Sequence, residues 1–348
     1  MGTIAMATAN TKDLSLLGAV YSYASNCGID VSSAEWRTPN LDLVTGHSYR
    51  VYSENSSGYA YATFSMPSDL PTVYARCAFK IPVNYGGEVT ILEFYEASGM
   101  TLHGKVTVTP NGGVVRAYRS TTLLASTAAL AFTPFTWNVV EVMFTPADSG
   151  GRFEIRINGV AVINFTGDTR NLGTAGRCGL VRMGMTTTMG VAAMYMDDIV
   201  ISDNAWPGTG GLWVLPVTGN GDLQEWTASA GEQYECVDDL PGDFTNYIYA
   251  SGAVAGVDSN FEFANLPLTP TTIGPVMLVA QARAAAPGSV PMRTIAYSGA
   301  TVANGATTGV DVGTVELTQI MDVDPATSAA WNEAGVNALK GGVGIATA

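Results

Sequence analysis

The chain has 348 residues, of which 47% are hydrophobic, so it can bury a sizeable core and is not intrinsically disordered. Charged residues make up only 13%, against a usual value of ~25%, and four of them are lysine, which disfavours the charge-rich surfaces of helical proteins and favours β-structure. The net charge of −14 argues against nucleic acid or an anionic membrane as a partner, because both attract positively charged surfaces.

Targeting signals are absent from the sequence pattern. Residues 1–13 contain neither a basic region nor a long apolar run, and no later stretch reaches the ~20 apolar residues of a membrane span. We therefore expect a protein made in the cytoplasm without a signal peptide.

Short runs of alternating apolar and polar residues dominate from about residue 48 onward and predict many antiparallel strands. Asn158-Gly159 is the strongest hairpin signal, because both residues accept the positive φ angles of a type I′ turn. The strands on either side of it should pair. The strands predicted in the first part are Val73–Ile81, Val89–Tyr95, Leu102–Val108, Val114–Tyr118, Trp137–Phe144, Arg152–Ile157, Val160–Phe165 and Met194–Ile201.

A turn-forming run at residues 202–211 coincides with a change in charge. Residues 1–205 carry 13 basic and 16 acidic residues, whereas residues 206–348 carry 3 basic and 14 acidic ones. We therefore predict an acidic second domain at residues 207–348, a first β-domain at 51–206, and an N-terminal attachment arm with the first strands at 1–50.

The second domain is predicted to be another β-sandwich with a single C-terminal helix. The helix is expected over Ser328–Leu339, where it would close one end of the sandwich with Trp331, Val336 and Leu339. The strands predicted here are Leu212–Val217, Gln233–Val237, Asn246–Tyr249, Phe261–Phe263, Val276–Arg283, Met292–Tyr297 and Gly313–Met321.

Several segments carry a family resemblance by their order along the chain. They are Arg76–Phe79, Glu93–Tyr95, Thr136–Val142, Phe153–Gly159 and Met196–Val200, followed by Trp206–Gly208, Asn220–Asp222, Val237–Asp239 and Asp324–Trp331. The part from about residue 73 to 201 resembles a concanavalin A-like or laminin G-type jelly roll. The whole of 60–348 resembles a group of tailed-bacteriophage virion proteins in which a jelly roll is joined to a second β-domain.

The resemblance implies an all-β protein that is a non-enzymatic structural component of the virion surface, either a capsid decoration or a tail-associated appendage. Its partners would be other copies of itself in a homo-oligomer and a major capsid or tail protein. It would be made in the host cytoplasm. Residues 1–50 lie outside the resemblance, and we expect them to be the arm that attaches the protein to the particle, since such arms often become ordered only in the assembly.

A carbohydrate-binding adhesin is the first alternative, with a host-surface glycan as partner. Sugars stack their apolar faces on exposed aromatic rings, and Tyr59 and Tyr61 are two residues apart, so they share one face of a strand. The competing interpretation places these rings in the core of a sandwich.

A glycoside hydrolase is the second alternative, because concanavalin A-like folds also carry such enzymes. The retaining mechanism needs two carboxylates ~5–5.5 Å apart. Glu93 and Glu96 are three residues apart, which places them on opposite faces of a regular strand. His47 and His103 lie in no nucleophile motif and are interpreted as surface or loop residues. We therefore predict no catalytic residues.

Metal binding is expected to be absent, with Ca²⁺ as the alternative. The candidate ligands are Asp198, on a strand next to Asp197, and the loop carboxylates of Asp238, Asp239 and Asp243. None of these follows an EF-hand spacing, so solvated carboxylates are the competing interpretation. No other cofactor is predicted.

The cysteines and three tryptophans are given structural roles. Cys27, Cys77, Cys178 and Cys236 form no CxxC pair, so buried free thiols are expected rather than a zinc or thioredoxin site. Trp206, Trp213 and Trp226 flank the predicted boundary and are interpreted as packing between the domains.

Overall fold

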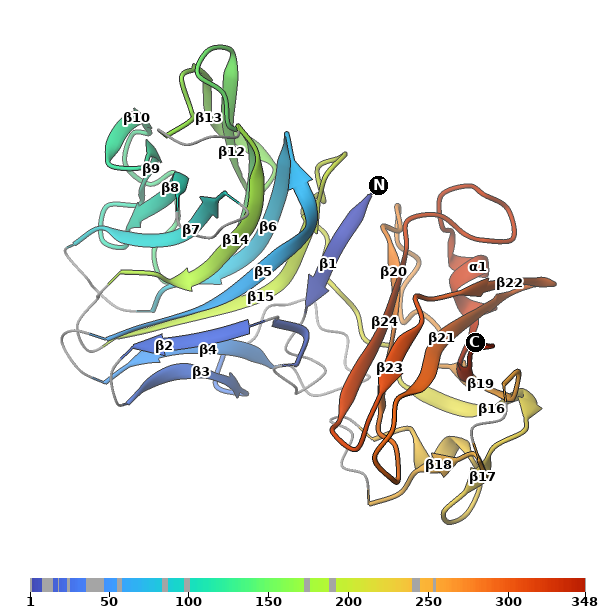
Figure 1. The fold of residues 1–348 in the computed structure, drawn as a ribbon. Coiled ribbons are helices and arrows are strands. Elements are labelled where there is room, and N and C mark those ends of the chain that lie inside the picture. The colour runs from blue at the N-terminus through green and yellow to red at the C-terminus, as the bar shows by residue number, and fades with distance from the viewer. Residues whose placement is uncertain are drawn as a thin grey trace. The chain divides into compact units, whose positions relative to one another are not determined.

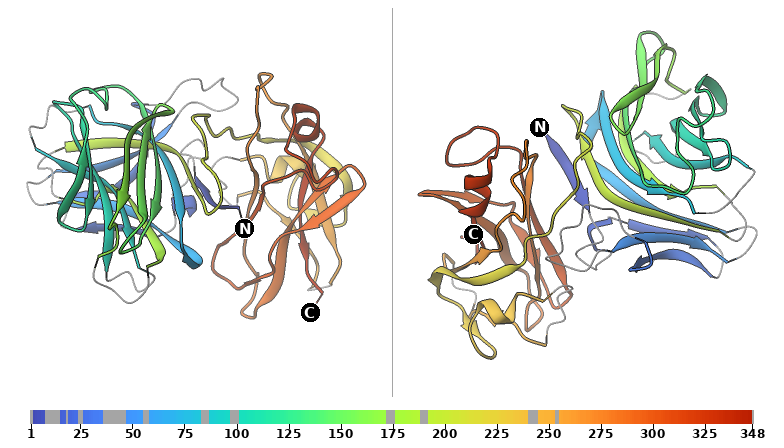
Figure 2. Two further views of the ribbon diagram at one scale, coloured as in Figure 1. Left: turned by 90° about the horizontal axis from the view of Figure 1, so that it is seen from above. Right: turned by 180° about the vertical axis from the view of Figure 1, so that it is seen from behind.

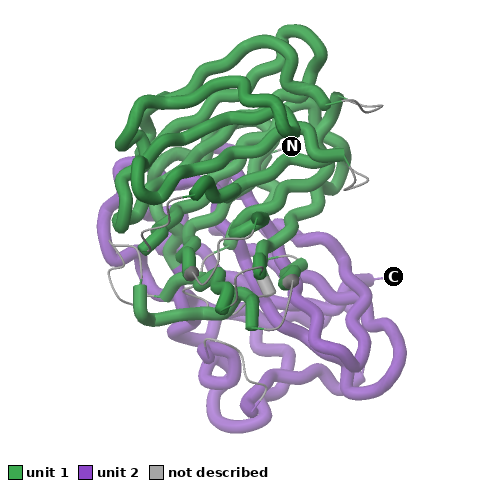
Figure 3. The backbone as a smooth tube through the Cα atoms, turned by 90° about the vertical axis from the view of Figure 1, so that its left-hand side faces the viewer, with its two compact units in different colours: residues 1–213 green, residues 214–348 purple. Residues whose placement is uncertain are grey.

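The computed structural model describes residues 2–7, 15–17, 19–23, 26–35, 47–54, 58–82, 87–96, 101–171, 176–187, 192–239, 245–252 and 255–347. Of these residues, 55% lie in strands and one α-helix is present, so the described structure is nearly all β. The chain divides into two compact units, Met1–Trp213 and Val214–Ala348 (Figure 3). The division falls after Trp213, whereas the sequence pattern places the start of the second domain at residue 207.

Unit 1 consists of two antiparallel sheets with the hydrophobic core between them (Figure 1). The eight-stranded sheet runs in the order β13 (Val160–Gly167), β12 (Gly151–Ile157), β11 (Asn138–Thr145), β6 (Val73–Lys80), β15 (Ala192–Ser202), β4 (Ser48–Ser53) and β3 (Cys27–Ser32), with β1 (Thr3–Ala7) also paired to β15. The seven-stranded sheet runs in the order β10 (Thr122–Ser126), β9 (Val114–Arg119), β8 (Leu102–Thr109), β7 (Val89–Tyr95), β14 (Cys178–Met185), β5 (Tyr59–Leu70) and β2 (Ala19–Tyr23).

This arrangement confirms the predicted jelly-roll sandwich. All eight strands predicted in this part of the chain are present with ends shifted by at most two residues. The hairpin at Asn158-Gly159 is also present, with φ angles of 52° and 83° and with Ile157 opposite Val160. Strand β14 was not predicted, because Gly179 and Gly184 lower its strand propensity.

The described parts of residues 1–50 belong to the sandwich itself. Strand β1 pairs with β15, β2 pairs with β5, and β3 pairs with β4. A short 3-10 helix, η2 (Ser15–Leu17), buries Leu17 in the same core. These strands are therefore part of the two sheets of unit 1. The role of residues 1–50 in attachment to a particle stays a prediction.

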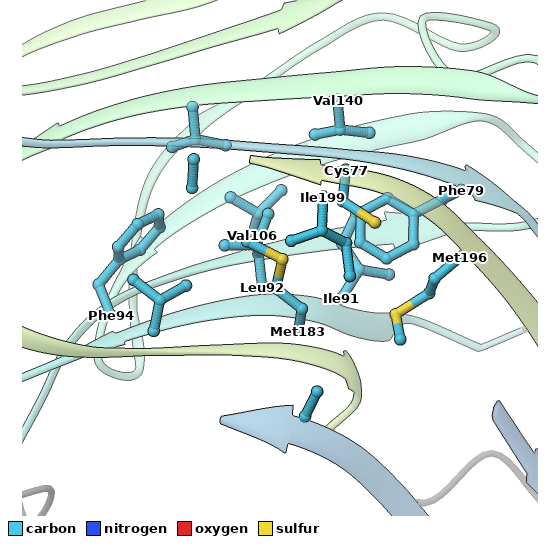
Figure 4. Packing of buried hydrophobic residues seen from close by; sticks show 14 of the residues in the cluster. Cys77, Phe79, Ile91, Leu92, Phe94, Val106, Val140, Met183, Met196 and Ile199 are labelled. Carbon is cyan, nitrogen blue, oxygen red and sulfur yellow. The ribbon is translucent and has the colours of Figure 1, made fainter. Parts of the chain in front are cut away.

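The core of unit 1 is built from the alternate residues that each sheet turns toward the other. Phe79, Phe94 and Met183 are among the side chains packed there (Figure 4). The four cysteines are free and buried, as predicted. Because the inward-facing set is apolar on every central strand, the opposite faces of both sheets are left for polar contacts.

Unit 2 is a second β-structure, whose layers are a six-stranded sheet and a two-stranded ribbon (Figure 2). Its two small cores contain residues from both layers, such as Leu317 from the ribbon and Met292 from the sheet. The sheet runs β16 (Val217–Gln224), β19 (Asp258–Phe263), β25 (Lys340–Ile345), β21 (Val290–Ser298) and β22 (Thr301–Asn304), with β23 (Thr308–Val310) also on β21; the ribbon is β20 (Val276–Ala282) with β24 (Val315–Met321), and β17 (Thr227–Ala228) pairs with β18 (Ile248–Tyr249).

Two predicted strands of the second domain are wrong. Residues 212–216 lie in no ladder, and the chain enters strand β16 only at Val217. Residues 234–236 form the 3-10 helix η3 (Tyr234–Cys236), in which the amides of Cys236 and Val237 donate to carbonyls three residues back. Alternation over five residues is too short a signal to separate a strand from such a turn.

The predicted helix is present but shorter than expected. Helix α1 (Glu333–Asn337) begins after Asn332, whose side chain caps it by accepting a hydrogen bond from the Gly335 amide at 2.9 Å. The preceding residues form a turn around Asp324, in which Ser328 has a φ of 54°. Trp331, Val336 and Leu339 pack against Leu278, Ala296 and Met321, so the segment does close part of this core.

Replacing Asp324 with alanine is expected to destabilise unit 2 by about 2–3 kcal/mol, because the buried carboxylate accepts hydrogen bonds from Ser298, the Ala326 amide and Thr327. The hydrogen bond from Ser298 lowers the pKa of Asp324, with the other two donors adding to it against the opposing effect of burial. A carboxyl whose pKa is lowered on folding contributes stability above its unfolded value of ~3.9, and this contribution is lost as the pH falls through the lower folded value.

Urea unfolding of both proteins at pH 7 and pH 3 checks this prediction. The difference between wild type and variant should shrink at pH 3. An equal difference at both values would contradict the role given to the ionised carboxylate.

Candidate functional site

The outer face of the seven-stranded sheet gathers tyrosines and charged side chains. The residues that face away from the core alternate with the buried apolar ones along each strand. We call this surface the tyrosine face and define it by Tyr21, Tyr59, Tyr61, Tyr95 and Tyr118 together with Arg182, Glu93 and Lys105. They come from strands β2, β5, β7, β8, β9 and β14.

Three of these tyrosines form a stacked row. The rings of Tyr21 and Tyr61 lie opposite each other on paired strands, with centroids 5.6 Å apart. Tyr61 also stacks on Tyr59 along β5, with centroids 6.1 Å apart and planes inclined by 9°. Tyr21 is 52% exposed, and Tyr59 and Tyr61 are half-buried. The row therefore places three partly exposed aromatic rings next to one another on the outer face.

Arg182 links this row to a buried carboxyl group. Its guanidinium carbon lies 4.9 Å from the ring centre of Tyr61 and 4.1 Å from that of Tyr95, so the charge is held between two aromatic faces. Its Nη1 donates to the Tyr95 hydroxyl at 2.8 Å, and that hydroxyl donates to Glu93 Oε2 at 3.0 Å. A guanidinium, a phenol and a carboxyl group thus form one chain of hydrogen bonds.

Burial changes the protonation of both acids in this chain. Burial raises the pKa of Glu93. The hydrogen bond from Tyr95 and the charges of Arg182 and Lys105 lower it by a smaller amount, so the pKa is raised overall. Burial also raises the pKa of Tyr95, and the neighbouring Glu93 adds to that effect. Tyr95 therefore stays a neutral hydrogen-bond donor, while Glu93 takes up a proton more readily than an exposed glutamate.

The pairing register aligns these residues in a row across the sheet. Lys105 lies opposite Glu93 and next to Tyr118, with its Nζ 5.1 Å from the centre of the Tyr118 ring. The row brings together residues far apart in the sequence. In order across the seven strands it consists of Ala19, Thr63, Arg182, Glu93, Lys105, Tyr118 and Leu123.

A second carboxylate, Glu88, lies beside this row and is already neutralised. It accepts hydrogen bonds from Arg116 at 2.8 Å, from Tyr118 at 3.2 Å and from Thr107. Burial would raise the pKa of Glu88, but these hydrogen bonds and the Arg116 charge outweigh it and lower the pKa. Glu88 is thus an ionised structural partner of Arg116.

Sequence reasoning identified part of this site. Tyr59 and Tyr61 do share one strand face, and that face points away from the core. Arg182 was missed because its strand was not predicted, although the alternation of Leu180, Arg182 and Gly184 with Val181 and Met183 is visible in the sequence. His103 is fully buried on β8, which corrects its interpretation as a surface or loop residue.

The outer face of the other sheet is covered by residues 206–212, which we call the junction segment. Trp206 packs edge-on against Tyr74, with centroids 5.4 Å apart, and its ring lies 3.8 Å from the guanidinium carbon of Arg156. The Gly208 amide donates to Glu141 at 2.7 Å. These contacts keep the segment in unit 1 and explain why the units divide after Trp213.

Asp198 belongs to this covered face. A bulge in β15 gives Asp198 a φ of 53°, and both Asp197 and Asp198 are buried there, which overrides the alternation expected of a regular strand. Asp198 lies 3.7 Å from Arg76 and accepts a hydrogen bond from the Leu212 amide at 2.7 Å. Its carboxylate therefore anchors the junction segment.

The remaining predicted metal ligands belong to the sequence of the second domain. Asp238 and Asp239 follow η3 in unit 2, and Asp243 lies outside the described residues. In the part of the chain that the structure describes, no three His, Cys, Asp or Glu residues are grouped to hold a metal ion. In the same part, the helices are all too short or too polar to span a membrane.

The three boundary tryptophans have separate surroundings. Trp206 contacts unit 1 as described above, and Trp213 is half-buried at the end of that unit. Trp226 is buried in the core of unit 2, where its indole donates to the Val257 carbonyl at 3.1 Å. The described contacts of Trp206 and Trp226 thus lie within their own units.

Comparisons with known proteins give a distant likeness. No protein-family model matches the chain, and no curated protein matches its sequence. A solved structure named "Sialidase" has a TM-score of 0.42 and 11% identity, covering 59% of this chain and 19% of that one. Alginate lyase Aly36B has a TM-score of 0.39 and 13% identity, covering 59% of this chain and 93% of that one.

A third solved structure comes from a phage. It is a conserved carbohydrate esterase from the Shiga toxin-encoding bacteriophage phi24B, with a TM-score of 0.39 and 13% identity, and the match covers 59% of this chain and all of that one.

Proposed function

We propose that this chain binds carbohydrate through the tyrosine face of unit 1. The observation that carries the proposal is the stacked row of Tyr21, Tyr61 and Tyr59, which continues directly into the Arg182, Tyr95 and Glu93 chain of hydrogen bonds. Aromatic surface and convergent polar groups are the two things a saccharide site needs.

The physical fit follows from the amphipathic nature of sugars. A pyranose ring presents C–H groups on its faces, which pack against aromatic rings, and hydroxyl groups at its edge, which need donors and acceptors. Tyr61 and Tyr21 supply the aromatic rings. Tyr95, Arg182 and Glu93 supply the hydrogen-bond donors and acceptors. Because these three side chains hold one another in place, little side-chain ordering is required on binding.

The experiment for this proposal is a saccharide array probed with the full chain. We expect saturable binding to a limited set of saccharides, confirmed by isothermal titration calorimetry. A flat array with no saturable binder would contradict the proposal. The same saccharides incubated with wild type and with Glu93→Gln should show no cleavage, because we propose binding without turnover; products that form with wild type and not with the variant would make the chain an enzyme.

We further propose that binding takes place on a phage particle. The support is the order of resembling segments over residues 60–348, from the jelly-roll strands to Asp324–Trp331. On the particle surface the chain would act as a capsid decoration or tail-associated appendage, in contact with other copies of itself and with a major capsid or tail protein.

Mass spectrometry of purified virions tests this placement. Peptides of the chain are expected in the particle, at a fixed ratio to the major capsid protein. Their absence would remove the virion role and leave the saccharide site to be explained elsewhere.

A further inference from the structure

Two positive charges on the tyrosine face lie near Glu93 and lower its pKa, but they form no ion pair with a described carboxylate. Eight basic side chains of unit 1 form ion pairs with Asp or Glu: Arg50, Arg76, Lys80, Arg116, Arg119, Arg152, Arg156 and Arg170. Arg182 and Lys105 form none with any described residue. Arg177 forms none either and donates to the Asp69 carbonyl instead, so what distinguishes Arg182 and Lys105 is that they lie in one row across the sheet.

These two cations flank Glu93. Arg182 lies directly opposite Glu93 on β14, and Lys105 lies directly opposite it on β8. With strands ~4.8 Å apart, the two backbones are about 10 Å from each other. Since Glu88 is already neutralised by Arg116, this part of the face carries two positive charges against at most one negative one.

Arg182 also keeps donors that the protein does not use. Of its five N–H groups, the structure shows one given to the Tyr95 hydroxyl, and Nε is buried without a hydrogen-bond partner among the described residues. The unused donors that a ligand could meet are therefore those on the two Nη atoms, and a planar carboxylate is their best-matched acceptor. Lys105 contributes an ammonium group that lies over the face of Tyr118 and close enough to Glu93 to lower its pKa.

We propose that the saccharide taken by the tyrosine face is acidic, and that Arg182 and Lys105 bind its carboxylate on either side of Glu93. This inference rests on the proposed carbohydrate-binding function and narrows the ligand to uronic-acid-type sugars. The sugar ring packs against Tyr61. This places the sugar next to Arg182, because the Tyr61 ring contacts the Arg182 guanidinium. Glu93 is a positioning residue, which holds Tyr95 and opposes the approach of a second negative charge.

The test is calorimetry of the full chain with saccharides drawn from an array that includes polygalacturonate, hyaluronan and alginate fragments. Each uronic-acid binder is compared with its carboxyl-reduced form, which has the same ring and no negative charge. We expect the acidic form to bind at least about 10-fold more tightly, which corresponds to the loss of one charge-assisted hydrogen bond.

Three variants separate the roles of the charged groups. Arg182→Gln and Lys105→Gln should each remove most of the preference for the acidic form, while Glu93→Gln should increase that preference several-fold. Arg50→Gln is the matched control, because Arg50 also lies over a tyrosine ring, at 4.8 Å, but on the other sheet. It should change neither affinity.

The outcomes distinguish this inference from the function on which it rests. If all the saccharides that bind are neutral, or if acidic and reduced forms bind equally well, the proposed preference for acidic sugars is wrong. The proposed carbohydrate-binding function would still stand. An array with no binder would overturn both. If Arg182→Gln fails to fold, as judged by circular dichroism, Lys105→Gln and Glu93→Gln still decide the matter, because Lys105 is half-buried and forms no ion pair with a described residue.

Discussion

Replacing Tyr61 with alanine is expected to weaken saccharide binding by about 30-fold. Tyr61 is the middle ring of the stacked row, where it contacts Tyr21 and Tyr59 and covers one side of the Arg182 guanidinium. Truncating a central aromatic residue of an interface typically costs ~2 kcal/mol or more, which is a factor of about 30 in affinity. Calorimetric titration with the best saccharide from the array measures this loss.

The control for this prediction is Tyr52→Ala. Tyr52 is also half-buried, lies on strand β4 of the other sheet and contacts Arg50 as Tyr61 contacts Arg182. It should bind saccharide like wild type. Equal losses for the two variants, or no loss for Tyr61→Ala, would show that the sugar is not held by the tyrosine face.

Replacing Phe144 with alanine is expected to lower the free energy of unfolding of unit 1 by about 3–5 kcal/mol, the usual cost of removing a buried phenylalanine ring. Phe144 is fully buried between the sheets, with its ring centroid 4.8 Å from that of Phe94 and 4.9 Å from that of Phe153. It also fills the space over Gly104, where any Cβ would come within 2.7 Å of its ring. The loss leaves a cavity that these rigid strands cannot close.

Urea unfolding followed by circular dichroism checks this prediction, with Val160→Ala as the control. Val160 is 66% exposed on strand β13, so its truncation should change the unfolding free energy by no more than about 0.5 kcal/mol. A Phe144→Ala protein with nearly wild-type stability would contradict the placement of Phe144 in the centre of the core.

Much of the fold of unit 1 can be predicted from the sequence, because each central strand places apolar residues at every second position. The pattern fails where other forces act on short segments. Strand β14 contains two glycines, and helix α1 starts only at Glu333 because the buried Asp324 carboxylate organises the turn before it. At Asp198 a bulge places two adjacent carboxylates in buried positions, which no alternation predicts.

Less of the candidate site than of the fold could be predicted from the sequence. Tyr59 and Tyr61 could be placed on one face because they lie on one strand. The contact of Tyr61 with Arg182, and the alignment of Arg182 with Glu93 and Lys105, depend on the register of strands far apart in the chain. That register includes bulges in the pairing of β7 with β8, so it cannot be counted from the sequence alone.

The most direct test of carbohydrate binding by unit 1 is a crystal structure of the full chain with the saccharide that binds best. We expect a sugar ring against Tyr61 on the outer face of the seven-stranded sheet, with a carboxylate between Arg182 and Lys105. A saccharide bound on the other sheet, or in unit 2, with the tyrosine face empty, would contradict it.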